Sequence, residues 1–378
     1  MSGVLGRLMG PHDGGRMAGL KKGDWWLIGV SAGLTVAAAV TSYVPSGKVV
    51  PFIAAALALA VLAALVGRAV DGLGDRLGSG ATGVVQSALG NIPELLFCIF
   101  ALRKGLVTVV QATIVGSILS NVLLVLGLAF IVGGLRHGPQ RFSAEGPRTI
   151  SLLLVLSVGI LIIPTITASL SLPAAAHEHV LSDVAAVVLL AVFALTIPGS
   201  LRRTENEAGQ GQSPGQAADE GHGDAKWPLW LAIGMLAVAG VAAALVSDWF
   251  ANSLTPALSA LHISQAFAGL VIVAIAGNAV ENFVGIQLAA RNRMDYALSV
   301  TLQSPVQIAL GIAPLLVLIS TGLGGAQLTL VFPPLMIVAL ALTALITTIV
   351  VFDGNSTWIE GTCLAGLYTV IAAAFWWG

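Results

Sequence analysis

Two stretches of this chain carry the same residue pattern. Residues 88–105 read ALGNIPELLFCIFALRKG, and residues 274–292 read AIAGNAVENFVGIQLAARN. The matched residues, at a constant offset of 187, are Gly90, Asn91 and Glu94 in the first copy and Gly277, Asn278 and Glu281 in the second. The same offset continues into the segments VGSILSNVLLVLG at 115–127 and LQSPVQIALGIAP at 302–314. A register kept through both segments without a gap indicates an internal repeat.

The composition places this repeat in a membrane protein. The chain has 378 residues, of which 57% are hydrophobic and 9% are charged, and its mean hydropathy is +0.94. A soluble domain carries about 25% charged residues, so a soluble fold of this size could not cover its surface. The composition excludes a soluble enzyme, a disulfide-stabilised scaffold, a disordered chain and an ordinary nucleic-acid-binding protein. We therefore expect an integral membrane protein that contacts the lipid bilayer and no nucleic acid.

Eleven stretches are long and apolar enough to span a bilayer as helices, which takes about 20 residues each. They are 25–44, 50–70, 82–102, 108–134, 149–170, 180–200, 227–247, 264–289, 296–320, 327–350 and 358–377. None of them alternates apolar and polar residues as the strands of a membrane β-barrel do. The sequence therefore predicts an all-α polytopic membrane protein with 11 transmembrane helices.

The helix count gives the expected domain layout. Five predicted helices separate the starts of the two copies, and an odd number reverses the direction through the membrane. Inverted repeats are typical of secondary transporters, whose sites lie near the membrane midplane between the repeats. The expected layout is a tail at 1–24, an extra helix at 25–44, a first five-helix repeat at 50–200, a linker at 201–226 and a second repeat at 227–378. The linker has no apolar run, which favours a solvated tether over a weak cation sensor.

Basic residues set the expected orientation. With the N-terminus in the cytoplasm, fourteen Lys and Arg residues fall on the inner side and three on the outer side, namely Lys48, Arg103 and Lys104. Cytoplasmic loops are enriched in basic residues, so we expect the N-terminus and the linker in the cytoplasm and the C-terminus outside. The Ala- and Gly-rich composition and the compact loops favour a bacterial plasma membrane, with a vacuolar-type membrane as the alternative.

Among the eighteen acidic residues, Glu94 and Glu281 alone lie deep inside predicted spans. A carboxylate at the bilayer centre costs at least ~2.5 kcal/mol and needs a partner, a cation or a proton. The two glutamates occupy equivalent positions in oppositely directed helices, so inverted symmetry would bring them face to face. Neutral glutamates that only pack helices together are the alternative interpretation.

Neutral oxygen-bearing side chains accompany the glutamates. Asn91 and Asn278 precede them by three residues and share their helix faces. The polar residues of the following helices are Ser117, Ser120, Asn121, Ser304 and Gln307. Carboxylates, amides and hydroxyls without a nearby thiol or imidazole suit a hard cation such as Ca²⁺, which binds six to eight oxygens. Helix packing is the alternative use of the neutral residues.

Helix breaks add backbone oxygens to this set. Pro93 has no N–H, so the carbonyl of Leu89, next to Gly90, loses its helical partner, and Pro305 breaks the second copy in the same way. The backbone at Leu89, Gly90 and the equivalent Gly277 is therefore expected among the cation ligands. Without a cation, two carboxylates at close range cannot both stay ionised and would bind protons. Competition between a cation and protons for one site is enough for antiport.

These motifs resemble the calcium/cation antiporter superfamily, and within it the Ca²⁺/H⁺ exchanger (CAX) family. The resembling stretches are GNIPELLFCIFALRKGL, GSILSNVLLVLGLAFIVGG, SDWFANSL, GNAVEN and SPVQIALGIAPLLV, which with the helix layout cover most of the chain past residue 50. The resemblance implies an alternating-access exchanger that expels cytoplasmic Ca²⁺ in exchange for protons. It also implies that Glu94 and Glu281 bind the cation and titrate. The flanking motif residues that match are Asn91, Asn278, Ser117, Asn121, Ser304 and Gln307.

Two further acids match the family in part. Asp71 in AVDGLG and Asp248 in SDWF stand where the family's motifs carry glutamate, which implies a proton-linked role; a solvated helix end is the alternative. The second copy reads QSPVQ where the family motif reads Gly-Ser-Ser-x-Gln. This departure leaves Na⁺ and Mn²⁺ open as cations besides Ca²⁺.

Other functions are weighed against this one. A Na⁺/Ca²⁺ or Na⁺/H⁺ exchanger is the alternative within the superfamily, because paired glutamates do not distinguish Na⁺ from H⁺ as the driving ion. A cation channel is disfavoured because it needs a continuous pore. An enzyme is not expected, since there is no HExxH motif and no Ser/His pair at membrane depth. No cofactor is predicted, Ca²⁺ and H⁺ are the expected substrates, and a homo-oligomer is left open.

Overall fold

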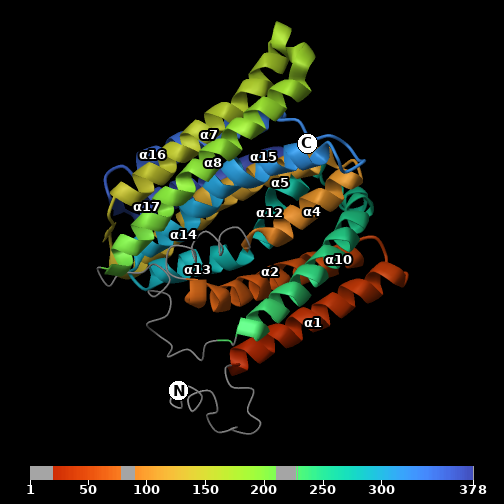
Figure 1. The fold of residues 1–378 in the computed structure, drawn as a ribbon, viewed down its shortest axis with the longest axis horizontal. Helices are drawn as coiled ribbons and strands as arrows, with labels where there is room; N and C mark the ends of the chain where they lie inside the picture. Colours follow the sequence, from red (N-terminus) through yellow and green to blue (C-terminus); the bar gives the residue numbers. More distant parts are fainter. Residues whose placement is uncertain (1–19, 78–89, 210–226, 228, 378) are drawn as a thin grey trace, which may run out of the picture.

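The protein is a bundle of long helices, many of which run side by side (Figure 1). The computed structural model describes residues 20–77, 90–209, 227 and 229–377. Within these ranges, eight helices are long and apolar enough to cross a membrane, or nine if the bent pair Gln265–Gly277 and Glu281–Ala290 is one span. Large apolar side chains such as Leu195, Trp230 and Val370 are exposed on the outside of the bundle. Such a surface suits lipid, and the protein is an integral membrane protein as expected.

The described residues of the first half of the chain form nine helical segments. They are α1 (Lys22–Tyr43), α2 (Val50–Leu77), α4 (Ile92–Arg103), α5 (Val107–Leu119), the π-helical segment η2 (Ser120–Val125), α6 (Leu126–His137), α7 (Glu145–Ser169), the 3₁₀ turn η3 (Pro173–His177) and α8 (Glu178–Gly209). Two-residue strands β1 (Gln140–Arg141) and β2 (Asn355–Ser356) pair antiparallel, so that the α6–α7 loop lies against the loop before the last helix.

The described residues of the second half form a corresponding series of segments. They are α10 (Leu229–Leu261), α11 (Gln265–Phe267), the π-helical segment η4 (Ala268–Val273), α12 (Ala274–Gly277), α13 (Ala279–Ala290), α14 (Met294–Gln307), the π-helical segment η5 (Ile308–Ile312), α15 (Ala313–Ser320), α16 (Pro334–Val350) and α17 (Trp358–Trp376). The offset of 187 residues found in the sequence relates α4 to α13 residue for residue, and each helix has 12 residues.

Three expected boundaries differ from the observed ones. The predicted linker begins at 201, but α8 continues to Gly209, because residues 201–209 (LRRTENEAG) contain good helix formers up to the glycine. The helix expected at 227–247 continues as α10 to Leu261, because the added residues are again mostly helix-compatible. Asp248 therefore lies inside a helix and not near its end.

A non-helical segment replaces the start of the helix expected at 327–350. Residues 321–333 connect α15 to α16, and α16 begins only at Pro334, where a proline fits the first helical turn. The adjoining Pro333 disfavours helical conformation in the residue before it. Side chains of other helices bond the backbone of this segment: Gln111 Nε2 donates to the carbonyl of Val331 at 2.7 Å, and Leu330 N–H donates to Ser182 Oγ at 3.0 Å.

A buried charge joins three helices at one end of the bundle. Asp24 of α1 accepts hydrogen bonds from Arg68 Nε of α2 at 2.9 Å and from Nε1 of Trp227 at 3.1 Å. Trp227 lies two residues before the start of α10. The helices α1, α2 and α10 run side by side (Figure 1). The charge of Arg68 and these hydrogen bonds offset the cost of burying the Asp24 carboxylate.

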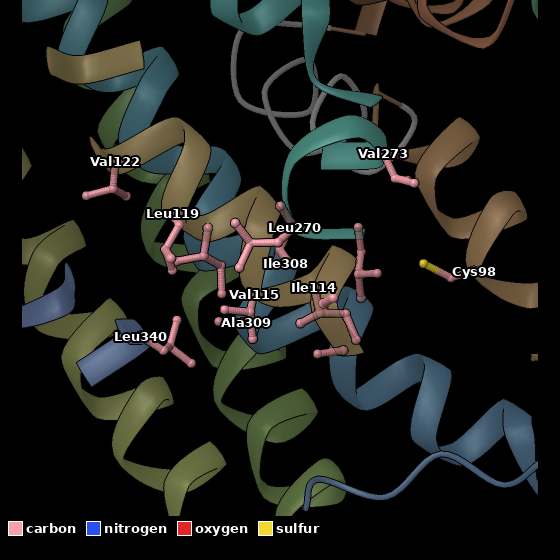
Figure 2. Packing of buried hydrophobic residues seen from close by; sticks show 14 of the residues in the cluster. Cys98, Ile114, Val115, Leu119, Val122, Leu270, Val273, Ile308, Ala309 and Leu340 are labelled. Atoms are coloured by element: carbon pink, nitrogen blue, oxygen red, sulfur yellow. The ribbon is translucent and has the colours of Figure 1, made fainter. Parts of the chain in front are cut away.

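The core lies where helices of the two halves meet. Figure 2 shows Val115 and Leu119 of α5 packed with Leu270 of η4 and Ile308 of η5, while Cys98 of α4 points toward the same cluster. Close helix crossings depend on glycine, as is common in membranes. At the crossing of α6 and α17, a Cβ atom added to Gly361 would lie 2.5 Å from the carbonyl oxygen of Gly127.

We predict that Gly361→Leu destabilises the protein by about 1–3 kcal/mol, because overpacking forces α17 away from α6. Thermal unfolding followed by size-exclusion chromatography in detergent should show a lower midpoint temperature. Gly366→Leu on the same helix is the matched control, because nothing lies within 4 Å of a Cβ atom added there. Equal midpoints for the two variants would contradict this account of the crossing.

Candidate functional site

Glu94 and Glu281 lie in the first turns of α4 and α13, the two 12-residue half helices of the site. Asn91 and Asn278 are the residues before α4 and α13, and their backbone angles are nearly the same, with φ −89° and ψ 6° against φ −102° and ψ 16°. Both helices therefore begin at the motif asparagine, and Glu94 and Glu281 follow in the first turn. A helix N-terminus carries partial positive charge, which favours an anionic side chain there.

The two motif glycines leave room for the opposite glutamates. A Cβ atom added to Gly90 would lie 3.9 Å from Glu281 Oε1, and one added to Gly277 would lie 3.8 Å from Glu94 Cβ. Each glycine therefore faces the acid of the other copy. The carboxylates of Glu94 and Glu281 are close enough to interact electrostatically. This reciprocal arrangement is what the sequence repeat predicts for a shared site.

Hydrogen bonds connect the two copies around Glu94. The hydroxyl of Ser117 donates to Glu94 Oε1. The Nδ2 of Asn278 donates to Ser117 Oγ at 3.1 Å. The hydroxyl of Ser304 lies 3.5 Å from Asn278 Oδ1 and also contacts the carboxylate of Glu281. The serine of each copy thus contacts the glutamate of its own copy, and Asn278 bridges the two serines.

A second pair of contacts extends the network. Asn91 Nδ2 of the first copy donates to Gln307 Oε1 of the second at 3.2 Å. Asn121 Nδ2 donates to the carbonyl of Ser117 at 2.9 Å, which leaves Asn121 Oδ1 directed elsewhere. Ser120 Oγ donates to the same carbonyl at 3.3 Å. Glu94, Asn91 and Asn121 are all buried, and Glu94 is 3% exposed.

The site has more acceptors than donors. The buried oxygens Glu94 Oε2, Glu281 Oε2 and Asn121 Oδ1 make no hydrogen bond to another described residue. A buried acceptor without a partner costs about 1–3 kcal/mol, and more when it is charged. In the described part of the chain, no three or more His, Cys, Asp or Glu side chains form a group suited to a metal ion. A cation bound here would be held by two carboxylates and neutral oxygens, which suits Ca²⁺.

The structure brings together most of the residues singled out in the sequence. Those in contact with one another around the two carboxylates are Gly90, Asn91, Glu94, Ser117, Asn121, Gly277, Asn278, Glu281, Ser304 and Gln307. Leu89 and the side chain of Asp71 lie outside the described residues. Asp248 is engaged elsewhere, because its carboxylate pairs with Lys104 Nζ at 2.9 Å.

Sequence reasoning missed two features of the site. The π-helical segment η2 begins directly after Leu119, and η5 begins directly after Gln307. Their last residues, Val125 and Ile312, are related by the same offset of 187. π-Helical segments are frequent at functional sites, but no residue type predicts them. Asn282 was also overlooked, although it follows Glu281 directly in GNAVEN; its Oδ1 is buried without a hydrogen-bond partner among the described residues.

The chain is similar to known proteins over most of its length. The model of the family "Sodium/calcium exchanger protein" matches residues 48–201 and 231–377. The Ca²⁺/H⁺ antiporter of Aphanothece halophytica is 35% identical over 333 residues, covering 86% of this chain and 89% of the relative. The Ca²⁺/H⁺ antiporter of Synechocystis sp. is 33% identical over 345 residues, covering 87% and 91%. The solved structure of native YfkE has a TM-score of 0.77 and 28% identity, covering 93% of this chain and 99% of that one. The chain belongs to the sodium/calcium exchanger protein family, and these two members of at least 33% identity are named as Ca²⁺/H⁺ antiporters.

Proposed function

We propose that this protein is a Ca²⁺/H⁺ antiporter, a transporter and not an enzyme. The observation that carries the proposal is the pair of buried carboxylates, each with one unpartnered oxygen, that face the motif glycine of the opposite copy. The similarity to two relatives named as Ca²⁺/H⁺ antiporters supports Ca²⁺ and H⁺ as the exchanged ions.

The donor set explains why the two ions compete. A bound Ca²⁺ would neutralise both carboxylates and use the unpartnered oxygens of Glu94, Glu281 and Asn121. Without it, two negative charges in a low-dielectric site repel each other, and protons satisfy the same oxygens. The hydroxyls of Ser117 and Ser304 hold the carboxylates in place in both states. One site then serves both ions, and binding one releases the other.

The proposal includes the finer layout expected from the sequence. We infer eleven crossings, made of helix α1 and two inverted repeats at 50–200 and 227–378, with the N-terminus and the linker in the cytoplasm. The equal lengths and constant offset of α4 and α13 support this repeat. The cation ligands also include backbone oxygens near Gly90 and Gly277. A bacterial plasma membrane is the inferred location, and a homo-oligomer stays a prediction that mass measurement in native lipid would test.

The first test measures ⁴⁵Ca²⁺ uptake and lumenal pH together in liposomes with an imposed proton gradient. The wild-type protein should take up Ca²⁺ as protons leave the lumen. Glu94→Gln and Glu281→Gln should each reduce this flux at least about 100-fold, because each removes a charge that the divalent cation needs. Glu178→Gln, which changes a half-exposed glutamate at the start of α8, is the matched control and should transport normally.

The same assay separates the alternatives. Ca²⁺ uptake that follows a sodium gradient and ignores the proton gradient would assign the protein to the sodium-driven exchangers. Flux that never saturates and does not change lumenal pH would indicate a channel. Full activity of Glu281→Gln would refute the role of the paired carboxylates.

A larger side chain at either motif glycine should block the site. We predict that Gly90→Val and Gly277→Val raise the KM for Ca²⁺ about tenfold or more, because the added atoms occupy space beside the opposite glutamate. The corresponding alanine variants should have smaller effects, since a Cβ atom alone makes ordinary contacts at 3.8–3.9 Å. Gly234→Val on α10 is the control, because nothing lies within 4 Å of a Cβ atom there. Wild-type KM in both valine variants would be evidence against the reciprocal site.

A proton-linked role for Asp248 is the last part of the proposal. Its carboxylate accepts from Asn252 Nδ2 at 3.1 Å and pairs with Lys104, whose Nζ also donates to Asn252 Oδ1. If Asp248 carries protons, Asp248→Asn should change how transport depends on external pH. Lys104→Met should change that dependence too, because it removes the cation paired with the carboxylate. Equal losses in the two variants with unchanged pH profiles would restrict Asp248 to a structural ion pair.

A further inference from the structure

The two half helices that carry the glutamates end in the same way. Leu106 N–H donates to the carbonyl of Ala101 and Gly105 N–H to that of Leu102, which closes the end of α4 with a Schellman motif. At the end of α13, Arg293 N–H donates to the carbonyl of Leu288 and Asn292 N–H to that of Ala289. These positions are 187 residues after those in α4. The left-handed residue is a glycine in α4 and an asparagine in α13, with φ +76° and +60°.

Each of these ends is held by a loop from the other half of the chain. The N–H of Ala326, in the α15–α16 segment, donates to the carbonyl of Leu102 at 3.3 Å. The Nε2 of Gln140, in the α6–α7 loop, donates to the carbonyl of Ala289 at 3.2 Å. Leu102 and Ala289 are themselves related by the offset of 187. Equivalent carbonyls at the ends of α4 and α13 therefore accept a hydrogen bond from the opposite repeat. The donor is a backbone N–H for α4 and a side-chain amide for α13.

The side chain and the backbone of Gln140 are both held in place by neighbouring residues. Gln140 is 3% exposed, its side chain fills the space that Gly133 leaves on α6, and its backbone pairs with Ser356 in the β1–β2 ladder. Its Nε2 donates not only to Ala289 but also to Asn292 Oδ1 at 2.7 Å. His137, the last residue of α6, also lies at this end of α13, with Nε2 3.0 Å from the carbonyl oxygen of Ala290.

We propose that Gln140 is a positioning residue that holds the C-terminal end of α13 and thereby sets the position of Glu281. The inference rests on the proposed function, since it concerns the same cation site. Glu281 lies eight residues before Ala289 on a continuous helix, which places it about 12 Å from the bond that Gln140 makes. A helix of three turns moves as a rigid rod, so a shift at its end shifts the carboxylate. The α15–α16 segment holds α4 and Glu94 in the equivalent way through its backbone.

The test replaces the amide and keeps the bulk of the side chain. Gln140→Met should raise the KM for Ca²⁺ about tenfold, as loss of a residue that orients a metal ligand does, while the maximal rate changes less than about twofold. Hydrogen–deuterium exchange should become faster in 279–290 and stay unchanged in 92–103. Gln265→Met is the matched control, because Gln265 is exposed near the other end of the same broken helix.

A second variant keeps the test decisive if Gln140→Met does not fold. Asn292→Gly restores the glycine that α4 has at this position and removes one acceptor of Gln140, so it should shift KM and exchange in the same direction by a smaller factor. The proposal would be overturned if the variants unfold at a lower temperature but keep the wild-type KM for Ca²⁺. Unchanged hydrogen–deuterium exchange in residues 279–290 would also overturn it. The exchange measurement does not depend on transport, so a wild-type protein that moves no Ca²⁺ would refute the proposed function and leave this test standing.

Discussion

The constraint on which this structure depends is the burial of two carboxylates at one place. Glu94 and Glu281 repel each other in a medium that screens charge poorly, so they are stable together only with a cation or with protons. The fold offers partial compensation: each acid lies in the first turn of a half helix, and the beginning of each half helix lies beside the acid of the other. Two helix N-termini therefore contribute positive potential to the same pair.

The helix breaks follow from this constraint. A continuous helix would bury its N–H groups in its own hydrogen bonds and bring no N-terminus to the membrane interior. Because α4 and α13 begin after Asn91 and Asn278, two helix N-termini lie there, and the glycine before each asparagine leaves room for the opposite glutamate. The asparagine side chains then bond across the repeats, to Gln307 and Ser117, so the irregular backbone is stabilised by the residues that line the site.

The sequence predicted which polar side chains lie together better than it predicted the helix boundaries. Glu94 and Glu281 can be recognised from the sequence alone, because a carboxylate inside a long apolar span is rare. The contacts of Glu94 with Ser117 and of Asn91 with Gln307 agree with that pattern. The non-helical segment 321–333 could not be predicted, because its backbone is satisfied by side chains far away in sequence, such as Gln111 and Ser182. The extension of α8 to Gly209 was missed because a polar composition was interpreted as a linker.

An excess of acceptors explains how one site can exchange two ions. Each serine hydroxyl has one proton to donate, and Asn278 and Asn121 already use their amide groups within the network. In the proposed exchange, the remaining carboxylate oxygens therefore coordinate a cation or bind protons, because no described residue donates a hydrogen bond to them. Because leaving them unpartnered in a buried site is costly, the site favours exchange of one occupant for the other over a vacant state. In the proposed mechanism, coupling follows from the two carboxylates of a single site, and the proton-linked role proposed for Asp248 is additional to it.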